Sequence, residues 1–263
     1  MTWKETEFPI FKGAKEVGDK VEAKRFWKFK LNELLDIDSE ICQEFFGGLT
    51  TWRQVARKVI ERVEYPFRMG LPDDKHTYNA YFGKYKRCWT LTADYWDKVS
   101  EVVATLVGDC DGSSIAIVGG CLIIGVEAYQ CLGYLYKGDK ILGGHAWPIV
   151  HDPESDKWYL VESTLDEVPE EYPEIDPETN WWNMNELRYH AWVKFNNTHY
   201  YEWIGGSESM GIKEYLKLGR KLKETREKYE AIRRAWRKRV KPLSRMGILE
   251  RLRWKYEGDK GRS

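Results

Sequence analysis

The apolar run Ile115–Ile124 constrains the fold of this chain more than any other feature. It is too short to cross a membrane, which takes about 18 apolar residues in a helix. We interpret it as a buried helix, and Gly125 suits the left-handed position that closes a helix. A helix buried in this way needs other elements packed around it, so the rest of the chain must supply them.

Amphipathic helices are predicted before this run and strands after it. Apolar residues recur at helical spacing from Trp52 to Val63, in a stretch that Thr51 opens. Thr92 is expected to cap a second helix, which Gly108 ends. The predicted strands are Val126–Tyr136, His145–Val150, Trp158–Thr164 and a hairpin over Arg188–Trp203 around Asn196-Asn197. Helices followed by strands indicate an α+β fold.

Composition narrows the class of protein. The 263 residues suffice for one large domain, or for one domain with an extension. A chain with 42% hydrophobic and 14% aromatic residues is not disordered throughout. The charged N-terminus, Met1–Glu7, has no apolar segment, so we expect no secretory signal and a cytoplasmic location. The 32% charged residues, with only three glutamines, lean towards a thermophile.

The five cysteines are odd in number and never spaced as Cys-x-x-Cys, which excludes a disulfide framework and a structural zinc site. Cys121 and Cys131 fall in the apolar helix and strand, where we expect core residues. Cys42 and Cys88 have no partner motif, and we expect them to be structural. No phosphate-binding or dinucleotide-binding motif is present, so we expect no cofactor and no metal.

Cys110 stands at the predicted start of the buried helix. The N–H groups and positive dipole end of a helix start stabilise a thiolate, the nucleophilic form of cysteine. The backbone N–H of Cys110 also offers half of an oxyanion hole. His145 opens one predicted strand and Glu162 closes the next, and antiparallel pairing brings such residues side by side. The three residues suit a nucleophile, a base and a carboxylate that orients the base.

Four ordered motifs resemble the transglutaminase-like cysteine enzymes, which share a papain-like core. They are Gly-Asp-Cys110-Asp-Gly-Ser-Ser, Gly125-Val-Glu-Ala-Tyr, Gly-Gly-His145-Ala-Trp-Pro and Trp158-Tyr-Leu-Val-Glu162-Ser-Thr. The resemblance spans roughly Thr51 to Trp203. It implies a nucleophile at Cys110, a base at His145 and an orienting acid at Glu162. Trp89-Thr-Leu-Thr resembles the segment before the cysteine in bacterial and phage-type members, so the indole N–H of Trp89 is a second candidate for the oxyanion hole.

The third site residue departs from the family, which usually has Asp in an Asp-Pro-Thr turn. Glu162-Ser-Thr stands here, and its longer side chain can orient the imidazole if the strands separate slightly. Asp166 or a nearby asparagine is the alternative. Asp109 and Asp111 flank the cysteine and would raise its pKa unless they point to solvent or cap the helix.

Two other histidines compete for the role of base. His190-Ala-Trp repeats the string around His145, but it lacks the preceding glycine pair and the following Trp-x-x-x-acid segment. His151 is expected to lie at the end of its strand, beside a turn. We therefore keep His145 as the base.

We predict an α+β core of papain-like, transglutaminase type, with the cysteine-bearing helix packed on an antiparallel sheet, over residues 51–205. Residues 1–50 form an N-terminal extension and residues 206–263 a basic helical one. The predicted function is a cofactor-free thiol enzyme that acts on amide bonds, peptide bonds first, through an acyl thioester. Its substrate is a protein or peptide. The alternatives are transamidation, in which a lysine amine replaces water, and a catalytically silent binding module on the same fold.

The C-terminal segment is strongly basic. Ser207–Ser263 holds 19 Lys or Arg against 8 Asp or Glu, whereas Asp152–Glu178 holds eleven acidic residues and one lysine. One continuous amphipathic helix is predicted from residues that recur every seven positions, with Leu218 and Ile232 between them: Tyr215, Leu222, Tyr229 and Trp236. We expect this helix to dock on its own domain in a monomer. Homodimerisation and binding of nucleic acid or an anionic surface are the alternatives.

Overall fold

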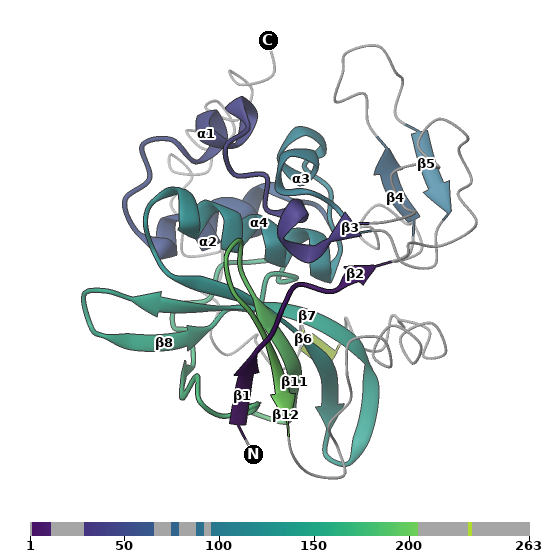
Figure 1. The fold of residues 1–263 in the computed structure, drawn as a ribbon, viewed down its shortest axis with the longest axis vertical. Helices are drawn as coiled ribbons and strands as arrows, with labels where there is room; N and C mark the ends of the chain where they lie inside the picture. The colour runs from purple at the N-terminus through teal and green to yellow at the C-terminus, as the bar shows by residue number, and fades with distance from the viewer. Residues whose placement is uncertain are drawn as a thin grey trace, which may run out of the picture.

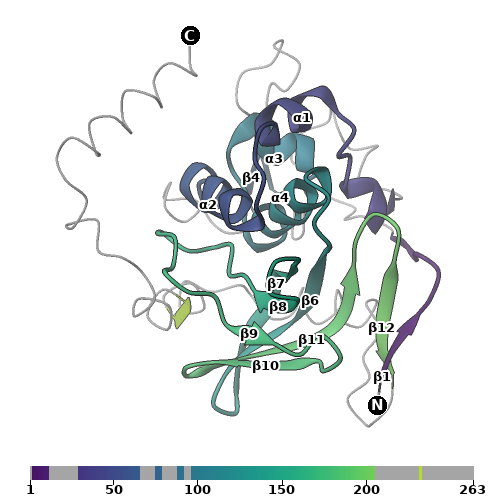
Figure 2. The same cartoon turned by 90° about the vertical axis from the view of Figure 1, so that its left-hand side faces the viewer.

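The computed structural model describes residues 2–11, 29–65, 75–78, 88–91, 96–204 and 231–232. Helices gather on one side of the molecule and a curled antiparallel sheet forms the other (Figures 1 and 2). The expected α+β arrangement, a cysteine-bearing helix packed on an antiparallel sheet, is confirmed.

The helical layer follows the local sequence closely. Its members are α1 (Glu40–Phe46), α2 (Trp52–Arg62), α3 (Val99–Thr105) and α4 (Cys110–Ile123), together with the 3-10 helix η2 at Leu31–Leu34. Thr51 caps α2, in a capping box in which its hydroxyl accepts from the N–H of Gln54. Gly125 follows α4 with φ +77°, the left-handed conformation that glycine adopts without strain.

Helix α3 is shorter than the sequence predicts. The predicted cap, Thr92, lies outside the described residues, and α3 begins at Val99 with Lys98 at the cap position. The helix ends at Thr105 rather than at Gly108, since Leu106 already adopts a left-handed conformation with φ +54°. Sequence periodicity fixed the buried face of this helix but not its ends.

Eight strands form the main sheet, in the order β1-β12-β11-β6-β7-β8-β9 with β10 paired to β11. They are β1 (Thr2–Glu5), β6 (Ala128–Lys137), β7 (Lys140–Asp152), β8 (Lys157–Leu160), β9 (Glu174–Ile175), β10 (Trp181–Met184), β11 (Leu187–Phe195) and β12 (Tyr200–Ile204). Every pairing is antiparallel, and the predicted pairs β7–β8 and β11–β12 are confirmed. Two smaller sheets pair β2 (Ile10–Phe11) with β3 (Phe29–Lys30) and β4 (Lys75–Tyr78) with β5 (Cys88–Leu91).

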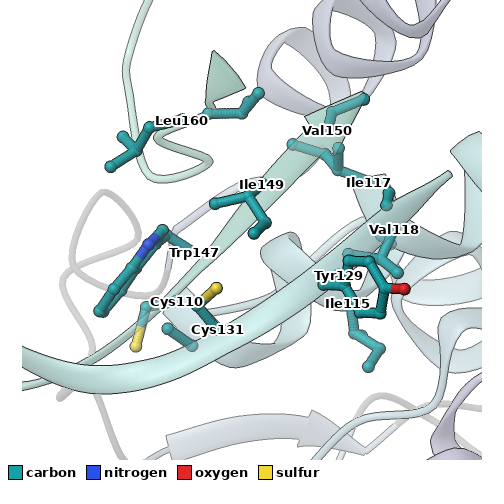
Figure 3. Close-up of a cluster of buried hydrophobic side chains, with 14 of the residues drawn as sticks. Cys110, Ile115, Ile117, Val118, Tyr129, Cys131, Trp147, Ile149, Val150 and Leu160 are labelled. Carbon is teal, nitrogen blue, oxygen red and sulfur yellow. The ribbon is translucent and has the colours of Figure 1, made fainter. Parts of the chain in front are cut away.

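Helix α4 lies at the centre of the fold. It packs against β6 and β7 on one side and against the other three helices on the other. All residues from Cys110 to Cys121 are buried, whereas Leu122, Ile123 and Ile124, the last residues of the apolar run, are partly buried. Figure 3 shows Ile115, Ile117 and Val118 of this helix in one apolar cluster with side chains of the two strands. This burial fixes the helix, and therefore its first residue, relative to the sheet.

Described residues from the N-terminal and C-terminal parts of the chain also join this core. We expected residues 1–50 to form an extension, but β1 pairs with β12 at the sheet edge, and Leu31 and Phe46 are fully buried. Of the predicted basic helix, the structure describes Ala231 and Ile232 alone; both are helical, 1% exposed and part of the hydrophobic core. No helix among the described residues is both long enough and apolar enough to traverse a membrane.

Candidate active site

Cys110 is the first residue of α4, as predicted. Asp109 caps the helix with an extended backbone, and its Oδ1 accepts from the N–H groups of Asp111 at 3.2 Å and Gly112 at 3.4 Å. Gly108 precedes the cap at a close approach, because a Cβ there would stand 3.0 Å from the nitrogen of Ser113. The tight entry places the cysteine at the positive end of a buried helix.

Two side chains fasten the first turn of α4 to its surroundings. The hydroxyl of Ser113 bonds to the carbonyl of Asp109 and lies 2.9 Å from the hydroxyl of Ser163, the residue after Glu162. Gln130 on β6 donates its Nε2 to the carbonyl of Asp111 at 3.2 Å and to the hydroxyl of Ser114 at 2.9 Å. The turn that carries Cys110 is therefore tied both to the sheet and to the segment that carries Glu162.

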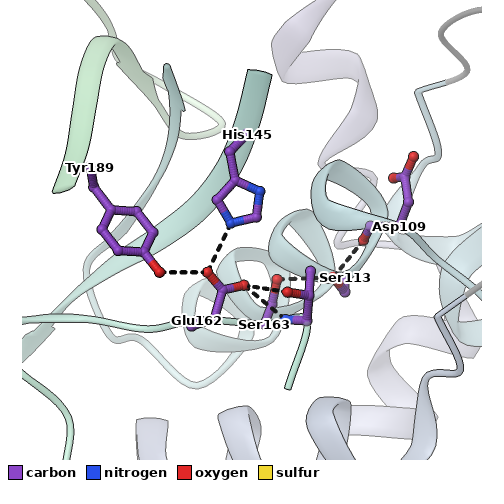
Figure 4. A network of polar contacts seen from close by, with 7 residues as sticks. Asp109, Ser113, His145, Glu162, Ser163 and Tyr189 are labelled. Carbon is purple, nitrogen blue, oxygen red and sulfur yellow. Dashed lines mark hydrogen bonds and ion pairs between the residues drawn. The ribbon is translucent and has the colours of Figure 1, made fainter. Parts of the chain in front are cut away.

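His145 and Glu162 are in direct contact, as the motif order predicts. Nε2 of His145 lies 2.8 Å from Oε2 of Glu162, and both side chains are 0% exposed. An ionised carboxylate only accepts hydrogen bonds, so Nε2 is the donor and Nδ1 of a neutral ring carries the lone pair. In Figure 4 this second nitrogen lies on the side of the ring nearer to Asp109, the cap of α4.

We expected Glu162 to close its strand, but it lies two residues beyond the end of β8. The chain still follows β7 for one step, through the bond from the N–H of Val161 to the carbonyl of Pro148 at 3.0 Å. Inside a strand, successive side chains must point to opposite faces of the sheet, but a residue beyond the end of the strand is not bound by this rule. The longer glutamate thereby meets the imidazole from the turn that follows the strand.

Four donors surround the carboxylate of Glu162 (Figure 4). Oε1 accepts from the N–H and the hydroxyl of Thr164 at 3.0 and 2.7 Å, and Oε2 accepts from His145 and from the hydroxyl of Tyr189 at 2.9 Å. Burial by itself would raise the pKa of Glu162, but the charge and hydrogen bond of His145, with the bonds from Thr164, lower it below its ordinary value. Glu162 is thus held as a carboxylate.

Two carboxylates lie close to the thiol of Cys110. One ligand atom each from Asp109, Cys110 and Asp111 falls within 4.8 Å of the others, and all three residues are buried. Asp109 caps the helix, which is one of the two arrangements expected to keep a carboxylate from raising the pKa of Cys110. Asp111 is buried and so does not have the other arrangement, a side chain that points to solvent. The three side chains supply fewer ligands than the four of a zinc site or the six to eight of a calcium site, and we assign them no ion.

The other described cysteines are ordinary core residues, as predicted. Burial raises the pKa of the Cys42 thiol to about 11 and the pKa values of Cys121 and Cys131 still further. Cys88 and Trp89 lie on β5, but their side chains fall outside the described residues. The predicted role of Trp89 in an oxyanion hole stays a prediction.

The two competing histidines have other partners. His190 is buried and stacks on Trp181 with ring centroids 3.7 Å apart, and burial together with the charge of Arg188 lowers its pKa to about 4. His151 lies at the end of β7 and contacts the turn residue Asp156 at 2.9 Å. Among the histidines whose side chains the structure describes, His145 is the one bonded to a buried carboxylate.

Comparison with solved structures finds distant resemblances. LapG from Legionella pneumophila matches with a TM-score of 0.36 and 14% identity over 71% of this chain and 83% of LapG. An EGTA-treated form of the same protein gives 0.35 and 13%, over 72% and 84%. A protein from Cytophaga hutchinsonii, assigned provisionally as a cysteine protease, gives 0.31 and 12%, over 61% and 57%. No family model and no curated protein matches the chain. Resemblances this weak assign neither family nor activity, so function is argued from the geometry.

Sequence reasoning missed most of the groups that support the pair. Tyr189 and Gln130 lie on β11 and β6, and neither belongs to a motif around the site. Thr164 was within reach of a local argument, because a carboxylate followed two residues later by Thr often accepts from that residue's N–H and hydroxyl. Tyr189 could be found only once the sheet order was known.

Proposed function

We propose that this chain is a cofactor-free thiol enzyme of the transglutaminase-like type, which acts on amide bonds, and first of all on peptide bonds. Cys110 is the nucleophile, His145 the base and Glu162 the residue that orients the base. The observation that carries the proposal is the fully buried bond between His145 and Glu162, joined through Ser163 and Ser113 to the first turn of the helix that Cys110 begins.

The first half of the reaction acylates the enzyme. Nδ1 of His145 takes the thiol proton of Cys110, and the thiolate attacks the carbonyl carbon of the amide. The carbonyl oxygen becomes an oxyanion, towards which the backbone N–H of Cys110 and the indole of Trp89 are the proposed donors. The imidazolium then gives its proton to the nitrogen, the C–N bond breaks, and the amine leaves a thioester on Cys110.

The second half resolves the thioester. A water molecule gives a proton to Nδ1 of His145 and adds its oxygen to the thioester carbonyl. The C–S bond then breaks, the carboxylic acid leaves, and the proton returns to the sulfur. A lysine amine in place of water would form a new amide by the same steps, and this is the transamidase alternative.

Glu162 serves the reaction without taking the proton. It fixes the tautomer in which Nε2 carries the hydrogen, and its charge stabilises the imidazolium that forms in both halves. The helix start favours the thiolate, but the buried carboxylate of Asp111 beside it opposes this effect. The thiolate therefore depends on the imidazolium, and loss of His145 should remove the reactivity of Cys110.

Thiol labelling tests the proposal directly. The full chain is treated with substoichiometric iodoacetamide at pH 6–7, and the label is located by intact mass and peptide mapping. We expect Cys110 to react first and His145→Ala to suppress its reaction by about tenfold or more, because a thiol is far less nucleophilic than a thiolate. His151→Ala is the matched control and should leave the rate unchanged.

The labelling outcome separates the enzyme from the silent binding module. If the label lands first on Cys42 or Cys88, or if the reactivity of Cys110 is the same with and without the His145 imidazole, the thiol is not activated and the enzyme proposal fails.

A further inference from the structure

We infer that Tyr189 is a positioning residue of this site, whose hydroxyl holds the carboxylate of Glu162 in the orientation that His145 requires. The inference rests on the proposed function and adds to it a residue that no motif indicates.

Tyr189 contacts the same carboxylate oxygen of Glu162 as His145 does. Its hydroxyl donates to Oε2 of Glu162 at 2.9 Å, the same oxygen that accepts from Nε2 of His145 at 2.8 Å. Tyr189 is 0% exposed, and its ring packs edge-on against Trp147 with centroids 5.1 Å apart. The hydroxyl therefore has a fixed place beside the pair rather than a choice of partners in water.

The frame behind Tyr189 is more rigid than the one behind Thr164. Thr164 belongs to the same turn as Glu162, so its bonds to Oε1 move together with the carboxylate. Tyr189 lies on β11, which pairs with β6, and β6 pairs with the strand that carries His145. Three adjacent strands thus fix the distance between the tyrosine and the imidazole. Tyr189 holds the carboxylate relative to His145, which Thr164 cannot do.

A glutamate needs such a restraint more than an aspartate would. It has one more rotatable bond, and Glu162 lies beyond the end of β8, where no ladder holds its backbone. Its charge is also fully buried, which favours protonation unless donors compensate. Tyr189 and Thr164 together fill the lone pairs that His145 leaves, so the side chain keeps one orientation and stays ionised.

The test compares two conservative variants of the full chain. Tyr189→Phe removes the hydroxyl and keeps the ring on Trp147. Tyr200→Phe is the matched control, because Tyr200 is equally buried and donates to a different glutamate, Glu202, at 2.8 Å. The rate of Cys110 alkylation by iodoacetamide is measured from pH 4 to pH 8 for both variants and for the wild type.

We expect Tyr189→Phe to slow alkylation at pH 6 by about tenfold, the size of effect that follows from losing one bond to a buried charge. Its acid limb should also move to higher pH, because a carboxylate with one donor fewer is protonated more readily and then no longer supports the imidazolium. Tyr200→Phe should match the wild type in both respects. A purely structural role for Tyr189 would lower stability without moving the acid limb.

A double variant keeps the test decisive if Tyr189→Phe alone does not fold. Glu162→Gln with Tyr189→Phe removes the charge together with its donor, so no uncompensated carboxylate stays buried. If Tyr189 acts through Glu162, this double variant should alkylate at the rate of Glu162→Gln alone.

Two results would overturn the inference and leave the proposed function standing. One is a Tyr189→Phe profile that coincides with that of Tyr200→Phe while His145→Ala still suppresses labelling. The other is a double variant that is slower than Glu162→Gln by the full tenfold, since the two residues would then act independently. If His145→Ala itself has no effect, it is the proposed function that fails.

Discussion

At the scale of single residues, the main feature of the site is a charged carboxylate that is buried away from solvent. Glu162 and His145 are both 0% exposed, and breaking a buried pair by removing one member leaves the other without compensation. The four donors around Glu162 make it a better acceptor of the imidazole hydrogen than of a proton of its own. The pair therefore contributes to stability as well as to the proposed chemistry.

Glu162→Gln separates these two contributions by pH. The folded pKa of Glu162 lies below its ordinary value of 4.5, so the ionised pair stabilises the fold fully above that pH and loses this contribution as the pH falls through the folded pKa. We expect the wild type to be more stable than Glu162→Gln at pH 7 and the difference to shrink below about pH 4.5. Urea unfolding midpoints of both proteins between pH 3 and 7 measure this.

If the proposed function holds, the same variant should lose amide-cleaving turnover by up to ~10⁴-fold while it keeps its fold at pH 7, because the proposed role of Glu162 is to orient the base. Circular dichroism checks the fold. A stability difference that grows towards acid pH would mean that Glu162 is protonated in the folded protein, and turnover equal to the wild type would move the orienting role to Asp166 or another residue.

At the scale of secondary-structure elements, α4 decides the position of Cys110. Two consecutive glycines let the other helices approach it closely. A Cβ on Gly120 would stand 2.5 Å from the ring of Phe46 and 2.6 Å from Val55, and a Cβ on Gly119 would stand 2.7 Å from Val99. The two glycines lower the helix propensity of α4, but because they have no Cβ they allow α1, α2 and α3 to pack closely around it.

Gly120→Ala tests whether packing or propensity prevails. Alanine gains about 1 kcal/mol of helix propensity over glycine, but overpacking of a filled core costs about 1–3 kcal/mol. Because the clash involves two side chains from two helices, we expect a net loss of stability and a lower unfolding temperature. Adding Phe46→Leu should recover part of the loss by making room for the methyl group. Unchanged or increased stability of Gly120→Ala alone would show that the helices shift apart at no cost.

At the scale of the whole molecule, segments far apart in sequence complete one core. The edge strand β1 comes from the first residues, and Ala231 and Ile232 come from the basic C-terminal segment. Ile232 is one of the apolar positions that the seven-residue pattern assigns to the buried stripe. Ile232 itself is 1% exposed and part of the core, and docking of the rest of the segment stays a prediction.

Ile232→Asp should therefore destabilise the full chain strongly, because it buries a charge that has no designed partner. Ile10→Asp is the control, since Ile10 is 49% exposed and should tolerate the change.

Deletion of Met210–Ser263 should likewise lower the unfolding temperature or cause aggregation, because it uncovers apolar surface. Thermal unfolding and size-exclusion chromatography measure both effects. A truncated chain that stays monomeric and equally stable would contradict docking, and a steep salt dependence of DNA binding would favour the nucleic-acid alternative.

The sequence by itself determined the parts of this protein that local physics governs. The spacing of apolar residues predicted α2, the continuous apolar run predicted α4, and the turn residues between β-rich segments predicted the strand pairs. The start of a helix at Cys110 was also predicted from nearby residues, and the order of motifs indicated Cys110, His145 and Glu162. All of these depend on residues a few positions apart.

Only the tertiary structure decided which distant groups meet. Tyr189 reaches Glu162 because β11 lies next to β6 in the sheet, and Ser163 reaches Ser113 because α4 packs on β7. The place of β1 at the sheet edge and the early end of α3 at Leu106 were equally out of reach. Strand order, and the backbone conformation of a single residue such as Leu106, depend on how all the elements of the core pack together. A local sequence pattern does not contain that information.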